Sequence, residues 1–382
     1  MIGLNRRRAL ATVAGAIAGL GWERGIGAEG KSSNAAATGA VQSPGALAPI
    51  RLSLNENPYG PAPGVVEAIT QDFPSLCRYT GGEFDNLLNT IATHESVRRE
   101  QVVLGEILEP LGTRLSLEGG PGGEFVYSDP GYTALIDAAA VVGGRAIAVP
   151  LNAELENDLD AIAAQINERT RAVYLVNPHN PTGIVSAADA FRDFARRLSK
   201  RTLVIVDEAY LEYTDDFSAR TLSDLVRAGE NIIVFRTMAK MYGLAGLEIG
   251  YGLLPNNLAT VLIAQGANDP HRFNRLAIAA ASASLRAADY VPRVRSAITS
   301  QREGWFRLLR ELHIRHTAST ANFIFIRTGL PHADFAAAML EHGVIIGRAF
   351  PPYDDWARIS IGLPAENARA QAAVHKILHS HA

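Results

Sequence analysis

The chain has 382 residues, of which 47% are hydrophobic and 20% charged, a composition typical of a globular protein with one large and one smaller domain. The formal net charge is −3 and neither sign is clustered over a long run, so we expect no nucleic-acid partner and take a small molecule as the default ligand. Cys77 is the only cysteine, which excludes an intrachain disulfide and a cysteine-based metal cluster, and we expect no metal site.

Residues 1–28 have the layout of an export signal. Three arginines at positions 6–8 precede an apolar run, Ala9–Gly21, that is rich in alanine and glycine. The run is too short for a helix rising about 1.5 Å per residue to cross about 30 Å of hydrocarbon, so we expect no stable membrane anchor. Adjacent arginines before a weakly apolar core are similar to a twin-arginine signal, which would place a folded protein in the periplasm or outside the cell. The alternative is a disordered basic N-terminus on a cytoplasmic protein.

The next segments lead into an α/β domain. Residues 29–48 are rich in Gly, Ala and Ser without periodicity and are predicted to be a linker, followed by an N-terminal arm over residues 49–79. Over residues 80–270, short apolar runs alternate with amphipathic stretches, which predicts a large domain with a mainly parallel sheet between helices. The clearest predicted strands are Ala172–Val176, Leu203–Val206 and Ile232–Phe235, and Ala187–Leu198 is a helical candidate.

Residues 271–382 are predicted to form a smaller α+β domain. Trp305–Leu312 has apolar residues at three- and four-residue spacing and is a helical candidate. Asn322–Ile326 and Ala357–Ile361 are predicted strands, separated by a predicted helix over His332–His342. We expect the functional site in a cleft between the two domains.

Polar motifs follow the three predicted strands of the large domain. They read NPHNPTG over residues 177–183, DEAY over residues 207–210 and RTMAK over residues 236–240. In open α/β sheets the carboxyl ends of strands carry the ligand, so the site is sought where these motifs lie. Each motif alone has a plain alternative, namely a turn, an acidic start of a helix and a surface lysine.

The order and spacing of these blocks resemble the class I/II aminotransferases, most closely the histidinol-phosphate aminotransferase branch. The likeness includes the longer blocks VDEAYLEY and RTMAKMYGLAGLEIGYG, the block LNENPYGP from Leu54 and the pair Arg78-Tyr79, and it runs from about Arg51 to the C-terminus. It implies a fold-type-I transferase that depends on pyridoxal 5′-phosphate (PLP), with a large sheet-containing domain and a smaller C-terminal domain. It also implies an enzyme that moves an amino group between a small-molecule amino acid and a 2-oxo acid, and that works as a homodimer.

The resemblance gives five residues roles around the cofactor ring. Lys240 matches the lysine that holds PLP as a Schiff base and moves a proton at the substrate α-carbon. Asp207 matches the carboxylate that keeps the pyridine nitrogen protonated, because an opposite charge within about 4–6 Å favours the charged form. Asn180 and Tyr210 match residues that hydrogen-bond the phenolic oxygen of the cofactor, and Tyr132 matches the aromatic residue that stacks on its ring.

Four further residues match contacts to the substrate or to a phosphate. Arg358 matches the arginine that binds the substrate carboxylate, whose two oxygens suit a planar guanidinium. Arg348 matches a second arginine that faces the substrate phosphate in the histidinol-phosphate branch, and a surface ion pair is the alternative. Thr237, three residues before Lys240, is placed to donate its hydroxyl to the cofactor phosphate. Tyr79 matches a tyrosine that contacts the cofactor phosphate of the neighbouring subunit, or else packs at an ordinary interface.

The region expected to hold the cofactor phosphate departs from the family pattern. Glu248 stands where relatives usually carry an arginine, so an attraction to the cofactor phosphate becomes a repulsion. At an effective dielectric of about 20, a pair of unit charges about 4 Å apart interacts by roughly 4 kcal/mol, which sets the scale of this loss. The Gly/Ser-rich turn expected before a phosphate-binding helix is shortened and retains only Gly105, and Ala239 replaces a common serine. Two explanations stay open: the chain binds PLP weakly or places its phosphate differently, or it is a degenerate or repurposed homologue.

The ring-facing residues leave other activities open. A decarboxylase, racemase, lyase or oxidase can use the same set, because the bond that breaks is decided by which one is held perpendicular to the ring. A non-catalytic homologue with impaired PLP binding is the alternative from another class. Export would argue against biosynthetic histidinol-phosphate turnover, which belongs in the cytoplasm.

Overall fold

The computed structural model of the chain describes residues 48–118 and 122–379. The predicted export signal and almost all of the predicted linker lie outside these residues, so both stay predictions. Ala48–Ala382 group as one unit, and the predicted division near residue 270 also stays a prediction. Within the described ranges, no helix is both long enough and apolar enough to span a membrane.

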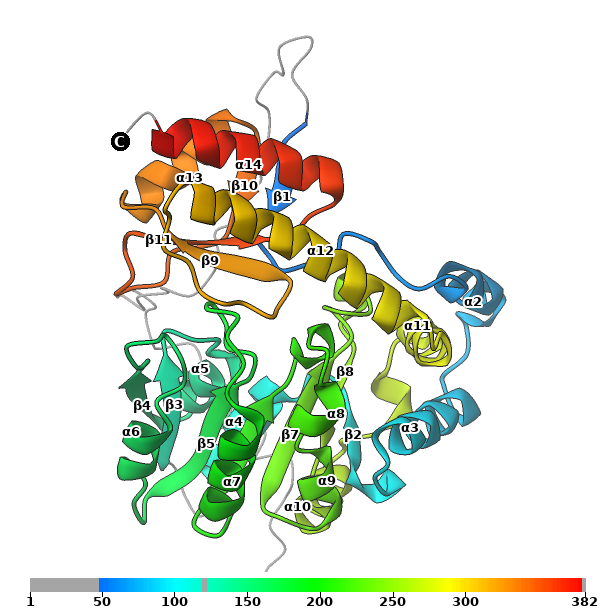
Figure 1. Cartoon of the computed structure of the whole chain (residues 1–382). Helices are drawn as coiled ribbons and strands as arrows, with labels where there is room; N and C mark the ends of the chain where they lie inside the picture. The colour runs from blue at the N-terminus through cyan, green and yellow to red at the C-terminus, as the bar shows by residue number, and fades with distance from the viewer. Residues whose placement is uncertain (1–47, 119–121, 380–382) are drawn as a thin grey trace, which may run out of the picture. The chain divides into compact units, whose positions relative to one another are not determined.

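A seven-stranded sheet carries the candidate site (Figure 1). Its strands lie in the order β2-β8-β7-β6-β5-β3-β4. They span Val102–Leu104 (β2), Gly250–Leu253 (β8), Ile232–Thr237 (β7), Leu203–Asp207 (β6), Thr170–Val176 (β5), Glu124–Asp129 (β3) and Arg145–Pro150 (β4). β8 runs antiparallel to both of its neighbours and the other pairs are parallel. The expected mainly parallel sheet and its three predicted strands are confirmed.

Helices cover both faces of this sheet because alternate side chains of a central strand enter different cores. Val204 of β6 packs in one core with residues of α7 (Ala188–Ser199), the helix predicted from the sequence. Ile205 packs in the other core with residues of α4 (Leu108–Leu117) and α5 (Ala134–Val141). Apolar runs without polar alternation are typical of parallel strands buried on both faces.

The C-terminal part is an α+β unit built from the predicted elements (Figure 1). β9 (Phe323–Arg327) pairs antiparallel with β11 (Trp356–Ser360), and α13 (His332–Glu341) lies between them in the sequence. β10 (Val344–Ile346) pairs in parallel with β1 (Ile50–Leu52), which belongs to the predicted N-terminal arm. The arm is therefore tied to the C-terminal unit by a strand pair.

The predicted helix at Trp305–Leu312 is the end of a longer helix, α12 (Tyr290–Glu311). The buried residues Tyr290, Val294 and Ile298 follow one another at four-residue spacing, so the buried face of the helix begins well before the predicted segment. Among the described residues the other α-helices are α2 (Val65–Asp72), α3 (Gly82–Glu95), α6 (Leu159–Ala164), α8 (Phe217–Arg220), α9 (Ser223–Arg227), α10 (Asn256–Ala264), α11 (Arg275–Arg286) and α14 (Pro364–His379). Short 3₁₀-helices span Phe73–Ser75 (η1), Arg99–Gln101 (η2), Leu211–Tyr213 (η3), Ala245–Leu247 (η4) and Pro270–Arg272 (η5).

The three polar motifs meet at one edge of the sheet. Val176 at the end of β5 lies opposite Asp207 at the end of β6, and Asp207 lies opposite Phe235 of β7. The motifs that follow these strands therefore leave the sheet at neighbouring positions. This edge is where the candidate site is built.

Candidate active site

Asp207 is the buried carboxylate of the site and is only 3% exposed. Its Oδ2 accepts a hydrogen bond from the Tyr174 hydroxyl at 3.0 Å, and its Oδ1 accepts one from the Ala209 amide at 2.9 Å. Burial raises the pKa of Asp207 to about 6, although both hydrogen bonds and the charge of Lys240 lower it. The sequence does not single out Tyr174, because its place in an apolar strand hides the contact that its hydroxyl makes across to β6.

Lys240 lies in the loop after β7 and is partly exposed. Its Nζ donates a hydrogen bond to the Leu54 carbonyl oxygen at 3.2 Å. Its positive charge lowers the pKa of both Asp207 and Glu106, so the amine lies within electrostatic reach of two carboxylates. The structure therefore brings the predicted Schiff-base lysine and the predicted ring-nitrogen partner together.

A cavity of about 420 Å³ opens beside the Lys240 loop. Its walls come from the N-terminal segment around Asn57, from the loop at Ala239 and from the end of β11 at Ser360. Segments from the arm, the Lys240 loop and the C-terminal unit thus line one space, but none of the predicted site residues lines it, so the expected cleft site stays a prediction. Asp207 does not line this space, so the cavity flanks the hydrogen-bonded centre of the site.

Arg358 of β11 connects the C-terminal unit to the NPHNPTG loop. Its Nη1 donates to Asn180 Oδ1 at 2.6 Å, and its Nη2 donates to the Ser53 carbonyl oxygen at 2.8 Å. Its Nε is buried and has no hydrogen-bond partner among the described residues. Burial lowers the pKa of Arg358 to about 10, which leaves the guanidinium charged at neutral pH. Buried donors are rarely left unpaired, so this free N–H fits the predicted role of binding a substrate carboxylate.

Tyr210 is buried, and its ring meets that of Phe323 edge-on with the centroids 5.1 Å apart. Its hydroxyl accepts a hydrogen bond from Asn55 Nδ2 at 3.1 Å, although the two residues are 155 positions apart. Asn55 is held in turn by Ser360, whose Oγ accepts from the Asn55 amide at 2.8 Å. Asn55, which the sequence marks only as part of the LNENPYGP block, is thus a residue of the site.

Arg348 lies beside the segment that carries Tyr132. Its Nη2 donates to the carbonyl oxygen of Gly131 at 3.3 Å. The guanidinium groups of Arg348 and Arg358 lie 4.2 Å and 5.0 Å from the ring centroid of Phe350. Arg348 forms no ion pair with any residue that the structure describes, so no contact supports the surface ion-pair alternative, and its role toward a substrate phosphate stays a prediction.

Tyr79 is not brought together with the other predicted site residues. It is 79% exposed, and its ring contacts His271 edge-on with the centroids 5.0 Å apart. Its carbonyl oxygen accepts a hydrogen bond from Arg275. In the described part of this single chain it makes no contact with the residues assigned to the cofactor ring, so its role in a neighbouring subunit stays a prediction.

Glu106 is a site residue that the sequence does not single out. It lies between β2 and α4, and its Oε1 accepts a hydrogen bond from the Thr237 hydroxyl at 2.9 Å. Burial raises the pKa of Glu106 to about 7; Thr237 and Lys240 lower it, and Asp207 and Glu248 raise it further. The hydroxyl expected to donate to the cofactor phosphate therefore donates to a carboxylate.

The shortened turn before α4 is a tight connection. Gly105 has a φ of 119°, which is open to glycine and strained for other residues. Its amide donates to the Gly250 carbonyl oxygen of β8 at 2.7 Å, so the loop is fixed against the sheet. Glu248, two residues before β8 begins at Gly250, is exposed and also has a positive φ of 51°.

The predicted cofactor fits the site at its ring end and not at its phosphate end. Four of the five groups expected at the ring lie at the sheet edge or in contact with it, on Asn180, Asp207, Tyr210 and Lys240. The fifth, Tyr132, follows Gly131, whose carbonyl oxygen accepts a hydrogen bond from Arg348. At the phosphate end, Thr237 is engaged by Glu106, and the exposed Glu248 adds a second negative charge nearby. The donor set there does not suit a dianion.

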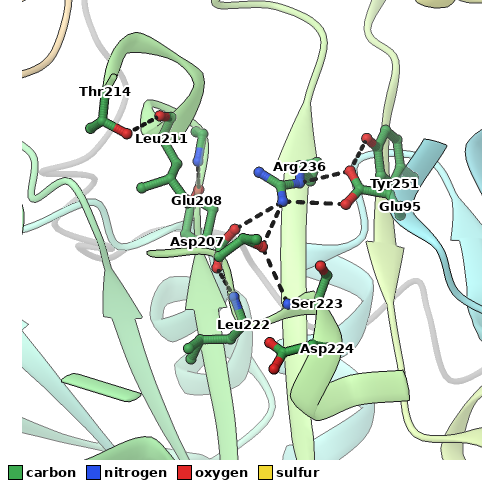
Figure 2. Close-up of polar contacts among 12 residues, drawn as sticks. Glu95, Asp207, Glu208, Leu211, Thr214, Leu222, Ser223, Asp224, Arg236 and Tyr251 are labelled. Atoms are coloured by element: carbon green, nitrogen blue, oxygen red, sulfur yellow. Dashed lines mark hydrogen bonds and ion pairs between the residues drawn. The ribbon is translucent and has the colours of Figure 1, made fainter. Parts of the chain in front are cut away.

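A buried ion cluster adjoins Asp207 and ties the sheet to α3 (Figure 2). Arg236 of β7 pairs with Glu95 at 2.9 Å between Nε and Oε1, and with Glu208 at 3.0 Å between Nη2 and Oε2. The Tyr251 hydroxyl of β8 donates to Glu95 Oε1 at 2.7 Å. The cluster thus fixes β6, β7 and β8 relative to one another directly beside the site.

Known proteins are similar to this chain in sequence and fold. The family described as aminotransferase class I and II matches residues 48–374. A histidinol-phosphate aminotransferase of Limosilactobacillus fermentum is 37% identical over 331 residues, which cover 85% of this chain and 89% of that protein. An aromatic amino acid aminotransferase of Cutibacterium acnes is 35% identical over 326 residues, which cover 85% and 91%. The crystal structure of a histidinol-phosphate aminotransferase from Sinorhizobium meliloti in complex with pyridoxal-5′-phosphate has a TM-score of 0.79 and 30% identity, covering 88% of this chain and 92% of that one.

Proposed function

Because this chain belongs to the class I and II aminotransferases, and is therefore a PLP-dependent transferase of amino groups, we propose that it moves an amino group between an amino acid and a 2-oxo acid at the sheet edge that carries Lys240. One observation carries the proposal: the Lys240 amine, the buried Asp207 carboxylate and the partly unpaired Arg358 guanidinium come from distant parts of the chain and serve the same edge.

Each group has a distinct task in this proposal. PLP, when bound, supplies an electron sink for the charge that develops at the substrate α-carbon. Lys240 is a nucleophilic amine and, once free, the base that moves the α-proton. Asp207, oriented by Tyr174, would hold the ring nitrogen of bound PLP and favour its protonated form. Arg358 offers its free Nε–H to the substrate carboxylate and so orients the α-carbon toward Lys240.

Arg348 favours a donor with a second anionic group, as in the histidinol phosphate named for several relatives. It is exposed, lies over the Phe350 ring and forms no ion pair with a described residue. Aromatic amino acids are the second candidate, because one relative is named for them and Phe350 and the half-exposed Tyr132 line the same region. Arg348→Gln separates the two: it should raise KM about tenfold or more for a phosphorylated donor and change little for phenylalanine.

The Schiff base is tested by absorbance and borohydride. Wild-type protein mixed with PLP should show a band near the visible edge that borohydride reduces, leaving the cofactor covalently attached. Lys240→Ala should lose the covalent product, whereas Lys200→Ala, an exposed lysine at the end of α7, should keep it. A wild-type protein that shows no band with excess PLP contradicts the enzyme proposal.

A donor panel then tests the reaction type. Amino acids that are true donors should convert the band and release the matching 2-oxo acid in equal amount. Recovery of the opposite enantiomer, carbon dioxide or peroxide instead would identify a racemase, a decarboxylase or an oxidase. The family does not favour these alternatives.

We also propose that the enzyme works as a homodimer in which Tyr79 completes the neighbouring site. The support is its 79% exposure in a single chain together with the family resemblance. Mixing inactive Lys240→Ala and Tyr79→Ala chains should restore about a quarter of wild-type activity, because half of the random dimers then hold one intact site. No recovery from a mixture shown to form hybrid dimers contradicts the proposal.

Export by a twin-arginine route remains a proposal based on residues 1–28 alone. Replacing Arg6 and Arg7 by lysine should retain the protein in the cytoplasm, measured by cell fractionation, while Arg8→Lys should still allow export. Equal distribution of wild type and the double variant contradicts it.

A further inference from the structure

The loop between β2 and α4 holds a carboxylate at a fixed position inside the site. Glu106 Oε1 accepts a hydrogen bond from the Thr237 hydroxyl at 2.9 Å. A Cβ added at Gly250 would lie 2.8 Å from the same oxygen, so the carboxylate packs directly against the backbone of β8. The Gly105 amide, bonded to the Gly250 carbonyl oxygen, anchors the loop from the other side.

The ionisable groups that face Glu106 are mostly negative. Asp207 at the end of β6 and Glu248 after η4 each raise its pKa, and Lys240 after β7 is the cation that lowers it. Tyr132, which follows β3, also lies within electrostatic reach of Glu106. Burial raises the pKa of Tyr132, and the charges of Asp207 and Glu106 raise it further. A ligand group with two negative charges at the Thr237 end would meet Glu106 and Glu248, while Asp207 at the ring end adds a third negative charge and Lys240 one positive charge.

We infer that PLP binds to this site together with a proton on Glu106, so that the end of the site at Thr237 accepts a phosphate dianion only when Glu106 is neutral. Pyridoxal, which carries an uncharged hydroxymethyl group in place of the phosphate, binds in either state. The inference rests on the proposed function and deepens it. A protonated carboxyl also becomes a hydrogen-bond donor, which suits a phosphate oxygen.

The direction of the pH dependence follows from the order of the ionisations. Burial raises the pKa of Glu106 to about 7. A phosphate monoester has a second pKa of about 6, so above neutral pH the ligand is already a dianion. Above the pKa of Glu106 the proton must come from solvent, and PLP affinity should fall about tenfold per pH unit. The affinity for pyridoxal has no such requirement.

Calorimetry on the full chain purified without cofactor tests this inference. PLP and pyridoxal are titrated near pH 7.5 and near pH 8.5, each in two buffers of different ionisation enthalpy, which gives both Kd and the number of protons taken up. The variants are Glu106→Gln, which keeps an acceptor for Thr237, and Glu118→Gln, an exposed carboxylate at the other end of α4.

In wild type and Glu118→Gln the ratio of Kd for PLP to Kd for pyridoxal should rise about tenfold between the two pH values, with about one extra proton taken up for PLP. In Glu106→Gln the ratio should stay constant, and PLP should take up no extra proton relative to pyridoxal. The inference is overturned if the ratio of Kd for PLP to Kd for pyridoxal changes with pH by the same factor in wild type and Glu106→Gln, or if wild type takes up no extra proton with PLP. Failure of the proposed function reads differently: both ligands would bind without the borohydride-sensitive band.

Discussion

The buried carboxyl of Glu212 should make the folded chain less stable as the pH rises, and Glu212→Gln should remove that effect. Glu212 lies in η3, is 6% exposed, and its Oε2 has no hydrogen-bond partner among the described residues. Burial raises its pKa from 4.5 to about 7; the charge of Arg236 lowers it, and the carboxylates of Glu95 and Glu208 raise it.

The sign and size follow from proton linkage. Below the ordinary pKa of 4.5 the carboxyl is protonated in both states and contributes nothing to the pH dependence. Between that value and about 7 the unfolded chain loses a proton that the folded chain keeps, so the free energy of unfolding falls by about 1.4 kcal/mol per pH unit. From about pH 5.5 to about pH 8 the fall amounts to roughly 2 kcal/mol, and above the folded pKa it stays constant.

Equilibrium urea unfolding, followed by tryptophan fluorescence, measures this effect, because Trp305 and Trp356 are both buried in the folded chain. Relative to wild type, Glu212→Gln should gain about 2 kcal/mol more near pH 8 than near pH 5.5. Glu341→Gln, at the exposed end of α13, is the control and should give the same difference at both values. An equal difference for Glu212→Gln at both values would show that Glu212 is already ionised and stabilised in the folded chain, contrary to this reasoning.

Three further substitutions test individual contacts. Tyr174→Phe removes a hydrogen-bond donor to Asp207, and a hydrogen bond to a charged group contributes about 1.5–3 kcal/mol, so kcat should fall at least about tenfold with KM nearly unchanged. The acidic limb of the pH profile of kcat should move to higher pH, because this hydrogen bond lowers the pKa of Asp207; an unmoved limb contradicts the assignment. Arg358→Lys keeps the charge but loses the planar fork, so kcat/KM for amino acids should fall about tenfold or more in steady-state transamination, and an unchanged value would place the carboxylate elsewhere. In Gly112→Ala the new Cβ would lie 2.1 Å from the Leu135 carbonyl oxygen, so α4 and α5 must move apart and urea unfolding should show a loss of about 1–3 kcal/mol; an unchanged midpoint would mean that the helices shift freely.

The sequence alone determines the sheet and the position of the chemistry along it. Apolar runs such as Leu203–Val206 are long enough only for buried strands, and each ends in polar or turn-forming residues. The carboxyl ends of neighbouring parallel strands lie at one edge, so Asp207 and Lys240 could be predicted to serve one site. The helices α7 and α13 are similarly local, since their apolar spacing is readable within one segment.

Tertiary structure alone decides which side chains meet across large sequence separations. Asn55 reaches Tyr210, and Thr237 donates to Glu106, 131 positions away. Neither contact leaves a local pattern, because a polar residue in a loop has the same sequence signature whether solvent or another side chain is its partner. The charge at the phosphate end depends on such contacts. Glu248 already indicates in the sequence a departure from the family pattern, but only the fold places Glu106 beside Thr237 and buries it. The residues at the ring end of this site can therefore be predicted from local motifs, whereas the contacts at its phosphate end are decided by long-range packing.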